Sequence, residues 1–371
     1  MSDSFNNIAD FETHKARIMV VGCGGGGCNT VSALTRKGVK GAQTVILNTD
    51  ARHLASSQAD KRILIGKNLT RGLGAGGFPD IGKNAALESK NEIREALQGA
   101  DLVFVTCGLG GGTGTGAAPV VASLAREMGA IVISVVTMPF KLEGARIIKA
   151  EAGMTTLRQS CDTVIAIENE RLLKLAGNKP LKQAFSLADD LIATMIKGIT
   201  ETISEPSLVN LDYADVRTIM RSGGVASIGF GESESSSRAK DAITAALNHP
   251  LLEVDYHGAT GALIQVIGGN DMKMEEINAI GEAVQSQLDP TAQVMWGARI
   301  VPEFDGKIQV ITIITGVHSP YIVGRENKQQ ETPTELGVEV LGSKKPAHGH
   351  DTPVHKQPRD FTPHDFRPKG Y

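Results

Sequence analysis

The sequence lacks the features that define several large classes of protein. No segment approaches the 18 consecutive apolar residues that a membrane-spanning helix needs. The opening stretch MSDSFNNIADFETHK contains no apolar core of the kind found in signal peptides. The formal net charge of -3 gives no indication of a nucleic-acid partner. We therefore expect a cytoplasmic protein that neither inserts directly into a membrane nor binds nucleic acid.

Two chemical motifs are also missing. The four cysteines, Cys23, Cys28, Cys107 and Cys161, do not show the paired spacing of a zinc site, which favours free thiols. The G-x4-G-K-[ST] motif of P-loop nucleotide hydrolases does not occur. A nucleotide site of that architecture is therefore not expected.

The order of the apolar runs predicts an α/β fold with two domains. Strand-like runs alternate with helix-like segments over residues 17–140, which is the pattern of a parallel sheet covered on both faces. A long amphipathic helix is predicted over 180–204, and residues 223–318 predict a second, smaller α/β unit. The strands are predicted at 17–21, 44–47, 102–105, 131–136, 225–229, 262–267, 294–300 and 308–314, and further helices at 117–128, 238–247 and 274–288.

Composition changes near the C-terminus. The last 41 residues hold six of the fifteen prolines and four of the nine histidines, which is typical of a segment without a packed core. We expect a flexible N-terminal segment at 1–16, a nucleotide-binding domain at 17–179, the central helix at 180–204, a C-terminal domain at 205–320 and a disordered tail at 321–371.

The most informative stretch is CGLGGGTGTGAAPVV at 107–121, where six glycines precede a helix-forming run. Glycine loses the most conformational entropy on ordering, so this density requires a reason. A buried strand comes before it and a helix after it. Exposed backbone N–H groups at a helix N-terminus form an anion site, so the stretch predicts a phosphate cradle.

A second cluster, GCGGGGC at 22–28, also follows a strand and opens a helix. Gly22, Gly24 and Gly27 fit the dinucleotide fingerprint G-x-G-x-x-G, and Asp50 lies where such a fold places an acid for the ribose. A Rossmann oxidoreductase is therefore one alternative, although the sequence offers no hydride-transfer residues. A third glycine-rich stretch at 71–77 favours a triphosphate held from several sides instead.

At this point the sequence resembles a known family. GGGTGTG at 110–116 matches the tubulin/FtsZ signature, and residues 15–320 are similar to FtsZ, the cell-division GTPases of bacteria and archaea, with the archaeal members more similar. The supporting stretches are NTDARHL at 48–54, RGLGAGGFPDIG at 71–82, VVTMPF at 135–140 and NLDYADVRTIM at 210–220.

The resemblance implies a GTP/GDP site with magnesium, a tubulin/FtsZ-like fold and self-assembly into head-to-tail filaments at the division site. By resemblance, glycines of the first two clusters hold the α- and β-phosphates with the hydroxyls of Thr113 and Thr115 as further donors, and the third stretch meets the γ-phosphate. Asn29 approaches the base, Asn48 and Asp50 lie near the sugar and phosphates, and Glu143 contacts the ribose and phosphates. The residues so implied are Gly24, Gly25, Gly26, Gly27, Asn29, Asn48, Asp50, Ala75, Gly76, Gly77, Gly110, Gly111, Gly112, Thr113, Gly114, Thr115, Gly116, Pro139, Glu143, Phe185 and Asp189.

Two residues of the long helix carry the prediction of guanine. Phe185 and Asp189 are four residues apart and so share one face. An aromatic ring stacks on a purine, and a carboxylate accepts from N1–H and the exocyclic amine of guanine, a donor pair that adenine lacks. For Phe185, packing in the apolar stripe of the helix is an equal alternative. For Asp189, which Asp190 follows, the alternative is a solvated helix face, and the resemblance favours guanine recognition for Asp189 only.

By resemblance, Asn210, Asp212 and Asp215 form the catalytic loop that polarises the attacking water. The helix that separates them from Asp189 rises 1.5 Å per residue, which places them about 30 Å from the base. A neighbouring subunit would then supply this loop, and repetition of that contact builds an open filament. The alternative is that Asp212 and Asp215 only cap a turn and a helix.

Two features depart from the family pattern. PFKLEGARIIKA has Glu143 but carries Ile147 where the family has an arginine, with Arg146 adjacent, so nucleotide affinity or turnover is expected to differ. A filament that binds GTP without cleaving it therefore stays open. The terminal RDFTPHDFRPKGY is not the usual bacterial tail motif, yet by resemblance a membrane-anchoring adaptor such as SepF would dock there or on the second domain.

Overall fold

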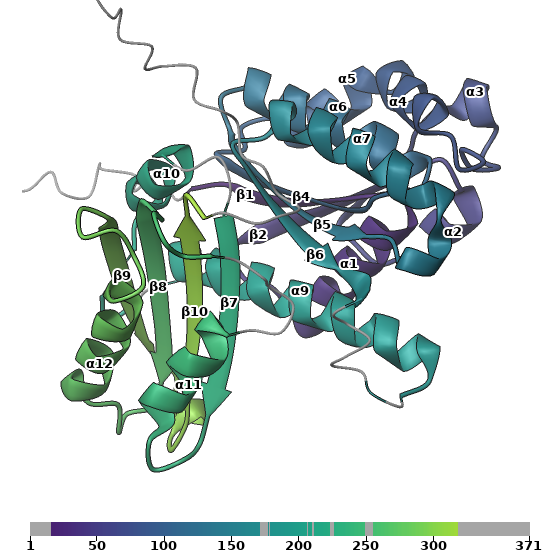
Figure 1. The fold of residues 1–371 in the computed structure, drawn as a ribbon. Coiled ribbons are helices and arrows are strands. Elements are labelled where there is room, and N and C mark those ends of the chain that lie inside the picture. Colours follow the sequence, from purple (N-terminus) through teal and green to yellow (C-terminus); the bar gives the residue numbers. More distant parts are fainter. Residues whose placement is uncertain are drawn as a thin grey trace, which may run out of the picture. The chain divides into compact units, whose positions relative to one another are not determined.

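Two β-sheets with helices packed on their faces make up the part of the chain that the structure describes (Figure 1). The computed structural model describes residues 16–170, 177, 179–205, 207–209, 211–222, 226–248 and 255–317, all within one compact unit that spans residues 1–326. The predicted tail at 321–371, and the predicted N-terminal segment apart from Ala16, lie outside the described residues.

The first sheet has six parallel strands in the order β3-β2-β1-β4-β5-β6. The strands are β1 (Ile18–Cys23), β2 (Ala42–Asn48), β3 (Lys61–Leu64), β4 (Leu102–Gly108), β5 (Ile131–Met138) and β6 (Thr163–Glu168). The described helices that accompany it are α1 (Gly24–Lys37), α2 (Ala51–Ser56), α3 (Lys67–Thr70), α4 (Pro79–Glu88), α5 (Lys90–Leu97), α6 (Thr113–Glu127) and α7 (Ala145–Ser160), with a short 3-10 helix η2 (Lys141–Glu143).

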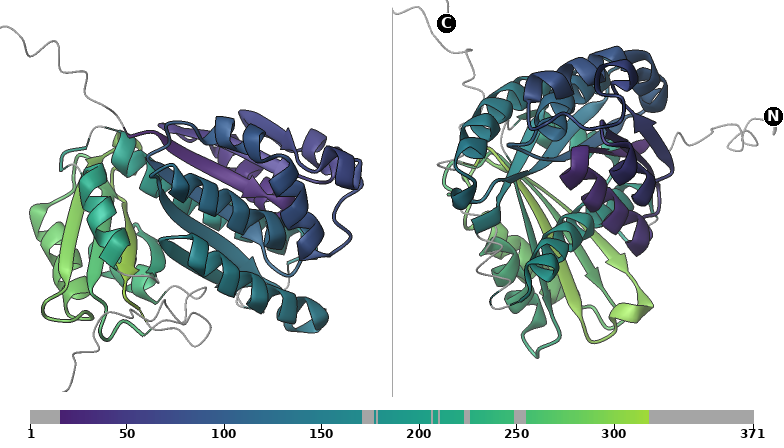
Figure 2. Two further views of the ribbon diagram at one scale, coloured as in Figure 1. Left: turned by 90° about the horizontal axis from the view of Figure 1, so that it is seen from above. Right: turned by 90° about the vertical axis from the view of Figure 1, so that its right-hand side faces the viewer.

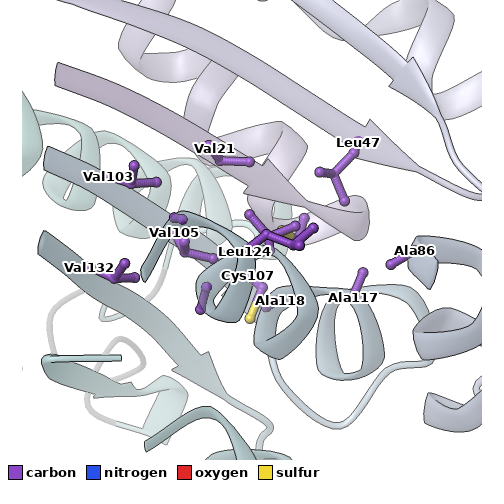
Figure 3. Close-up of a cluster of buried hydrophobic side chains, with 14 of the residues drawn as sticks. Val21, Leu47, Ala86, Val103, Val105, Cys107, Ala117, Ala118, Leu124 and Val132 are labelled. Atoms are coloured by element: carbon purple, nitrogen blue, oxygen red, sulfur yellow. The ribbon is translucent and has the colours of Figure 1, made fainter. Parts of the chain in front are cut away.

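The strands of this sheet are apolar on both faces because each face is covered. Along β4, Val103, Val105 and Cys107 point toward the layer of α6 (Figure 3), whereas Leu102 and Phe104 belong to the core on the opposite face. In Figure 2 the blue helices α4 to α7 lie together on one face of the sheet. The continuous apolar runs of the sequence therefore correspond to strands buried on both sides, as predicted.

The four cysteines are free and buried. Cys28 lies inside α1, and burial raises the pKa of its thiol to about 12. A thiol with so high a pKa is a poor nucleophile, so these residues act as small core side chains.

The long helix α9 (Leu181–Ser204) begins one residue later than predicted. It packs against α1 and against β10 of the second sheet. Ile192, Met195 and Ile199 are buried, as the apolar stripe predicts. Phe185 departs from the stripe: it is 43% exposed, so its packing alternative is wrong.

The second sheet has the order β7-β10-β8-β9, antiparallel except for the parallel pair β8 and β9. Its elements are α10 (Tyr213–Ser222), β7 (Ala226–Ser233), α11 (Arg238–Leu247), β8 (Gly261–Gly268), α12 (Met274–Gln285), β9 (Gln293–Ile300), the 3-10 helix η3 (Pro302–Phe304) and β10 (Ile308–Thr315). The predicted smaller α/β unit is confirmed. Buried Arg238 binds Asp271 and Glu276, which ties α11 to α12.

Three local predictions were incomplete or wrong. Strands β3 and β6 were not predicted, because β3 is a short edge strand that starts with two basic residues and β6 lies beyond the alternation over residues 17–140. Helix α6 begins at Thr113 rather than Ala117. Gly114 and Gly116 lie inside the helix although glycine has a low helix propensity. A β-carbon at either position would collide with the backbone, of Gly108 and Pro79 respectively, so close packing requires glycine at both.

Candidate functional site

The first two glycine clusters meet at one point of the first sheet. β1 and β4 are adjacent and parallel, with Cys23 paired to Cys107, so the segments that follow them leave the same edge side by side. From here the strand order runs outward in opposite directions, through β2 to β3 and through β5 to β6. Such a switch point opens a crevice at the carboxyl ends of the strands, where ligands bind in open α/β sheets. The N-termini of α1 and α6 both open at this crevice.

A groove runs through the crevice and consists of two cavities of about 540 and about 340 Å³. Both are within the size range of small-molecule sites. They are continuous because they share four lining residues, Gly26, Thr137, Asn169 and Phe185. We name the two cavities after the ligand parts that the sequence predicts beside them. The larger is the base end; its other lining residues are Asn29, Ser32, Arg36, His53, Ser56, Ser57, Ser186 and Asp189. The smaller is the phosphate end; its other lining residues are Gly25, Gly108, Leu109, Gly111, Gly112, Thr113, Gly114, Pro139, Glu143 and Arg146.

Packing explains most of the glycines around the phosphate end, but not all of them. A β-carbon on Gly112 would lie 2.8 Å from Ala75, and one on Gly27 would meet the backbone of β4. Gly25 and Gly111 differ, because a β-carbon there would have no atom within 4 Å. Both residues line the phosphate end. Packing against other residues therefore does not explain why these two positions are glycine. A backbone without a β-carbon lets a ligand approach closely.

The base end is closed by an aromatic ring and a carboxylate from α9. Phe185 packs edge to face on Phe140, with ring centroids 5.6 Å apart. The Thr30 hydroxyl donates to Asp189 over 2.8 Å. Burial raises the pKa of the Asp189 carboxyl to about 6, and the hydrogen bond from Thr30 opposes this rise. Asp190 raises the pKa further and Arg36 lowers it.

An ion pair lies at the phosphate end. Arg146 Nη1 lies 2.6 Å from Glu143 Oε2, while Glu143 Oε1 accepts from the Phe140 backbone N–H. Arg146 lines the cavity and Ile147 does not. Arg146, one position before the place where the family has an arginine, therefore lines the groove.

The groove gathers about half of the predicted nucleotide-binding residues. Those that line it are Gly25, Gly26, Asn29, Gly111, Gly112, Thr113, Gly114, Pro139, Glu143, Phe185 and Asp189. Gly24, Gly27 and Gly110 lie beside it and support its loops. The stretch Ala75–Gly77 adjoins it, because Ala75 faces Gly112.

Other predicted residues are engaged elsewhere. Asp50 caps α2 by accepting from the N–H groups of Arg52 and His53, and buried Asn48 accepts from the Asp50 N–H. The Thr115 hydroxyl accepts from the Gly110 N–H, and a β-carbon on Gly116 would meet α4. None of these four residues lines the groove. We leave them out of the proposed contact set.

The predicted catalytic residues lie far from this groove. Asp212 and Asp215 form a reciprocal cap of α10: the Asp215 N–H donates to Asp212 over 2.8 Å, and the Asp212 N–H donates to Asp215 over 3.3 Å. Next to them, the Tyr213 hydroxyl donates to the Asp101 carbonyl, just before β4 begins. The groove lies at the other end of β4, about 20 Å away at the rise of a strand. Asn210 lies outside the described residues.

Several lining residues were missed by the sequence interpretation, namely Ser32, Arg36, His53, Ser56, Ser57, Gly108, Leu109, Thr137, Asn169 and Ser186. Two signals could have found some of them. Asn169 directly follows β6 and Thr137 lies near the end of β5, and carboxyl ends of parallel strands meet at one edge. Arg36 follows Ser32 by four residues on α1 and so shares its face.

The chain has a doubly wound parallel sheet with a glycine-lined groove at its switch point. A long helix joins this sheet to a smaller domain with a mixed sheet. This combination defines a nucleotide-binding protein of the tubulin-like class. Comparison with known families agrees: residues 17–177 match the GTPase domain of the tubulin/FtsZ family and residues 224–318 match the C-terminal domain of the FtsZ family.

Known relatives agree with this assignment. The chain is 56% identical to cell division protein FtsZ 2 of Methanocaldococcus jannaschii over 88% of this chain and 87% of that protein. It is 54% identical to cell division protein FtsZ 1 of Thermococcus kodakarensis over 89% of this chain and 90% of that protein. A solved FtsZ dimer from M. jannaschii superposes with a TM-score of 0.78 at 51% identity, covering 82% of this chain and 89% of that one. The CetZ2 protofilament structure of Haloferax volcanii superposes with a TM-score of 0.70 at 25% identity, covering 81% of this chain and 93% of that one.

The chain belongs to the FtsZ family. It is a GTPase of the cell-division cytoskeleton, so the Rossmann oxidoreductase alternative is set aside. Among helices in the described ranges, none combines the length and apolar character needed to cross a membrane.

Proposed function

We propose that GTP lies along the groove with guanine at the base end and its phosphates at the phosphate end. The observation that carries this proposal is the continuity of the groove between Asp189 and the open backbone of Gly25 and Gly111. The ionised carboxylate accepts from N1–H and the exocyclic amine of guanine, and Phe185 stacks on the base. Backbone N–H groups at the two helix N-termini bind the phosphates.

Arg146 and the loop 71–78 complete the triphosphate end. Ile147 stands where the family has an arginine, and Arg146 takes over the role of that arginine. Arg146 binds a phosphate or the ribose, and its ion pair with Glu143 fixes the position of the guanidinium. Ala75 adjoins Gly112, so the loop that contains it is close to the terminal phosphate. Magnesium, a hard cation, is held mainly by phosphate oxygens and water. Glu143 is already engaged by Phe140 and Arg146, so it is not an open ligand.

Hydrolysis takes place between two copies of the chain. Asp212 and Asp215 are anchored by Tyr213 at the opposite end of β4 from the groove, so they cannot act on the nucleotide of their own chain. We assign them, with Asn210, to polarising water at the γ-phosphate of the next copy. The cap of α10 does not oppose this role, because the Asp212 side chain remains exposed.

Exposed apolar side chains near the phosphate end support the head-to-tail contact. Leu73 is 85% exposed and Phe78 59%, both on the 71–78 loop; Leu142 is 84% exposed and Ile148 72%, at and after η2. We call these four the apolar rim. On the segment before α10, Leu208 is 67% exposed. Each subunit then presents different surfaces to its two neighbours, and such heterologous contacts build open filaments. The solved dimer and protofilament of relatives support self-association.

Turnover against protein concentration tests this proposal. Phosphate release should climb more steeply than protein concentration, because the reaction centre forms only on assembly. Asp212→Ala should abolish release and leave GTP binding intact. Release strictly proportional to protein concentration would favour a site complete within one chain. A filament that binds GTP without cleaving it would show assembly and no release.

Attachment to the membrane is proposed through the C-terminal residues. We propose that residues 331–371, which lie outside the described residues, tether the filament to an adaptor such as SepF and hold it in the cytoplasm at the division site. Deletion of 331–371 should leave GTP turnover unchanged and delocalise the protein in cells. Unchanged localisation would refute the tether.

A further inference from the structure

Lys149 links the 71–78 loop to α7. Its Nζ donates to the Gly77 carbonyl over 2.7 Å and lies 5.4 Å from the centre of the Phe78 ring. We propose that Lys149 is a positioning residue that holds this loop against the phosphate end and so sets the preference for a triphosphate over a diphosphate. This inference rests on the proposed function, in which the loop meets the γ-phosphate.

The loop is well fixed at its first half by backbone contacts. The Gly74 N–H donates to the Thr49 carbonyl over 3.1 Å, and the Gly72 carbonyl accepts from the Ala51 N–H over 3.0 Å. Leu73 also forms a bridge with Asp50. These contacts join residues 72–74 to the segment between β2 and α2.

The second half of the loop depends on fewer contacts. Gly76 and Gly77 both have positive φ, at +58° and +77°, and a chain of two such glycines is easily displaced. The Phe78 N–H donates to the Ala75 carbonyl within the loop itself. Lys149 supplies a charged donor from outside the loop, and a hydrogen bond with a charged partner is stronger than a neutral one.

Lys149 also connects the loop to the glycine segment that lines the groove. One turn earlier on α7, Arg146 lies so close to Gly110 that a β-carbon there would be 2.8 Å from the Arg146 carbonyl. On the other side, Ala75 and the Phe78 backbone lie against Gly112. The start of α7 thus touches the glycine segment directly and reaches the 71–78 loop through Lys149. In the proposed binding mode GDP ends before this loop, so displacement of the loop should weaken GTP binding and spare GDP binding.

Affinities for GTP and GDP, measured below the concentration of assembly, test the inference. Lys149→Met keeps the aliphatic stem and removes the ammonium; we expect GTP to bind about three- to tenfold more weakly and GDP to bind within about twofold of wild type. Lys149→Arg should restore most of the difference. Phe78→Leu, which removes the ring beneath the ammonium, should give a smaller loss in the same direction. Lys83→Met is the matched control, because Lys83 lines the same surface cavity as Lys149 and its side chain forms no hydrogen bond or ion pair with the loop within the described residues.

Each outcome decides the question. Equal losses for both nucleotides in Lys149→Met would assign Lys149 a general structural role and overturn the inference, as would unchanged affinities. The same holds if Lys83→Met gives the same selective loss. Failure of the wild-type protein to bind GTP would instead refute the proposed function, which keeps the two failures distinct.

Discussion

The pH dependence of nucleotide binding follows from the environment of one carboxylate. Burial raises the pKa of Asp189 to about 6, and the Thr30 hydroxyl donates to it over 2.8 Å. Guanine donates two hydrogens and so requires the ionised carboxylate. Affinity should therefore be complete above about pH 7 and fall about tenfold per pH unit below the pKa. Thr30→Val removes the hydrogen bond at nearly constant volume and should move this fall to higher pH.

The energy of the hydrogen bond from Thr30 sets how far the pKa of Asp189 should rise in Thr30→Val. A hydrogen bond to a charged group contributes about 1.5 to 3 kcal/mol, and one pKa unit corresponds to about 1.36 kcal/mol. Because the groove is open to solvent, we take the lower end and expect a rise of about one unit. At pH 6 the wild type is about half ionised and the variant about one-tenth, so the variant should bind about fivefold more weakly. Above pH 8 the two proteins should bind equally.

The assay is a fluorescence titration of GDP and of GTP from pH 5 to 8. GDP and GTP should show the same shift, because both carry guanine. Thr35→Val is the control, since Thr35 on the same helix donates to the Val31 carbonyl and not to Asp189. Asp189→Asn should abolish the fall that this carboxylate causes, and a fall of unchanged size would show that Asp189 is not its source. An unchanged midpoint in Thr30→Val would refute the assignment of this hydrogen bond.

Further predictions follow from the same structure. Asp189→Asn should stabilise the nucleotide-free protein above pH 7 by at most about 3 kcal/mol, measured by urea unfolding, because a raised carboxyl pKa destabilises the fold as pH rises through it. Gly111→Ala should weaken GTP binding at least tenfold without changing unfolding, whereas Gly116→Ala should cost about 1 to 3 kcal/mol of stability by overpacking against α4. Leu142→Glu on the apolar rim should suppress sedimentable filaments and turnover while leaving the affinity of the monomer for GTP unchanged. Arg238→Leu should lower the free energy of unfolding measured in urea, because Asp271 and Glu276 lose their shared partner.

The sequence predicted the first sheet well because its pattern is strong there. Strands β1, β2, β4 and β5 are within two or three residues of the predicted ranges, since buried parallel strands form continuous apolar runs. The edge strand β3 carries Lys61 and Arg62 and has no such run. Helix α6 was misplaced because local propensity counts Gly114 and Gly116 against a helix, whereas packing requires them.

About half of the predicted site residues line one groove, and the reason that the others do not is the same for each. A sequence motif places residues along the chain but does not say which way each side chain points. Thr115 and Asp50 belong to the correct motifs, yet one supports a loop and the other caps a helix. Arg146 shows the reverse. It stands one position before the place where the family has an arginine, yet it lines the groove.

The central claim is that two copies share each reaction centre, and mixing two inactive variants tests it most directly. Asp212→Ala keeps the groove and lacks the catalytic loop, whereas Asp189→Ala keeps the loop and binds guanine poorly. Each alone should release almost no phosphate. In an equal mixture about one contact in four joins an intact groove to an intact loop, so release should recover to about one quarter of wild type. No recovery on mixing, with both variants folded, would contradict the claim, as would full-rate hydrolysis by Asp212→Ala alone.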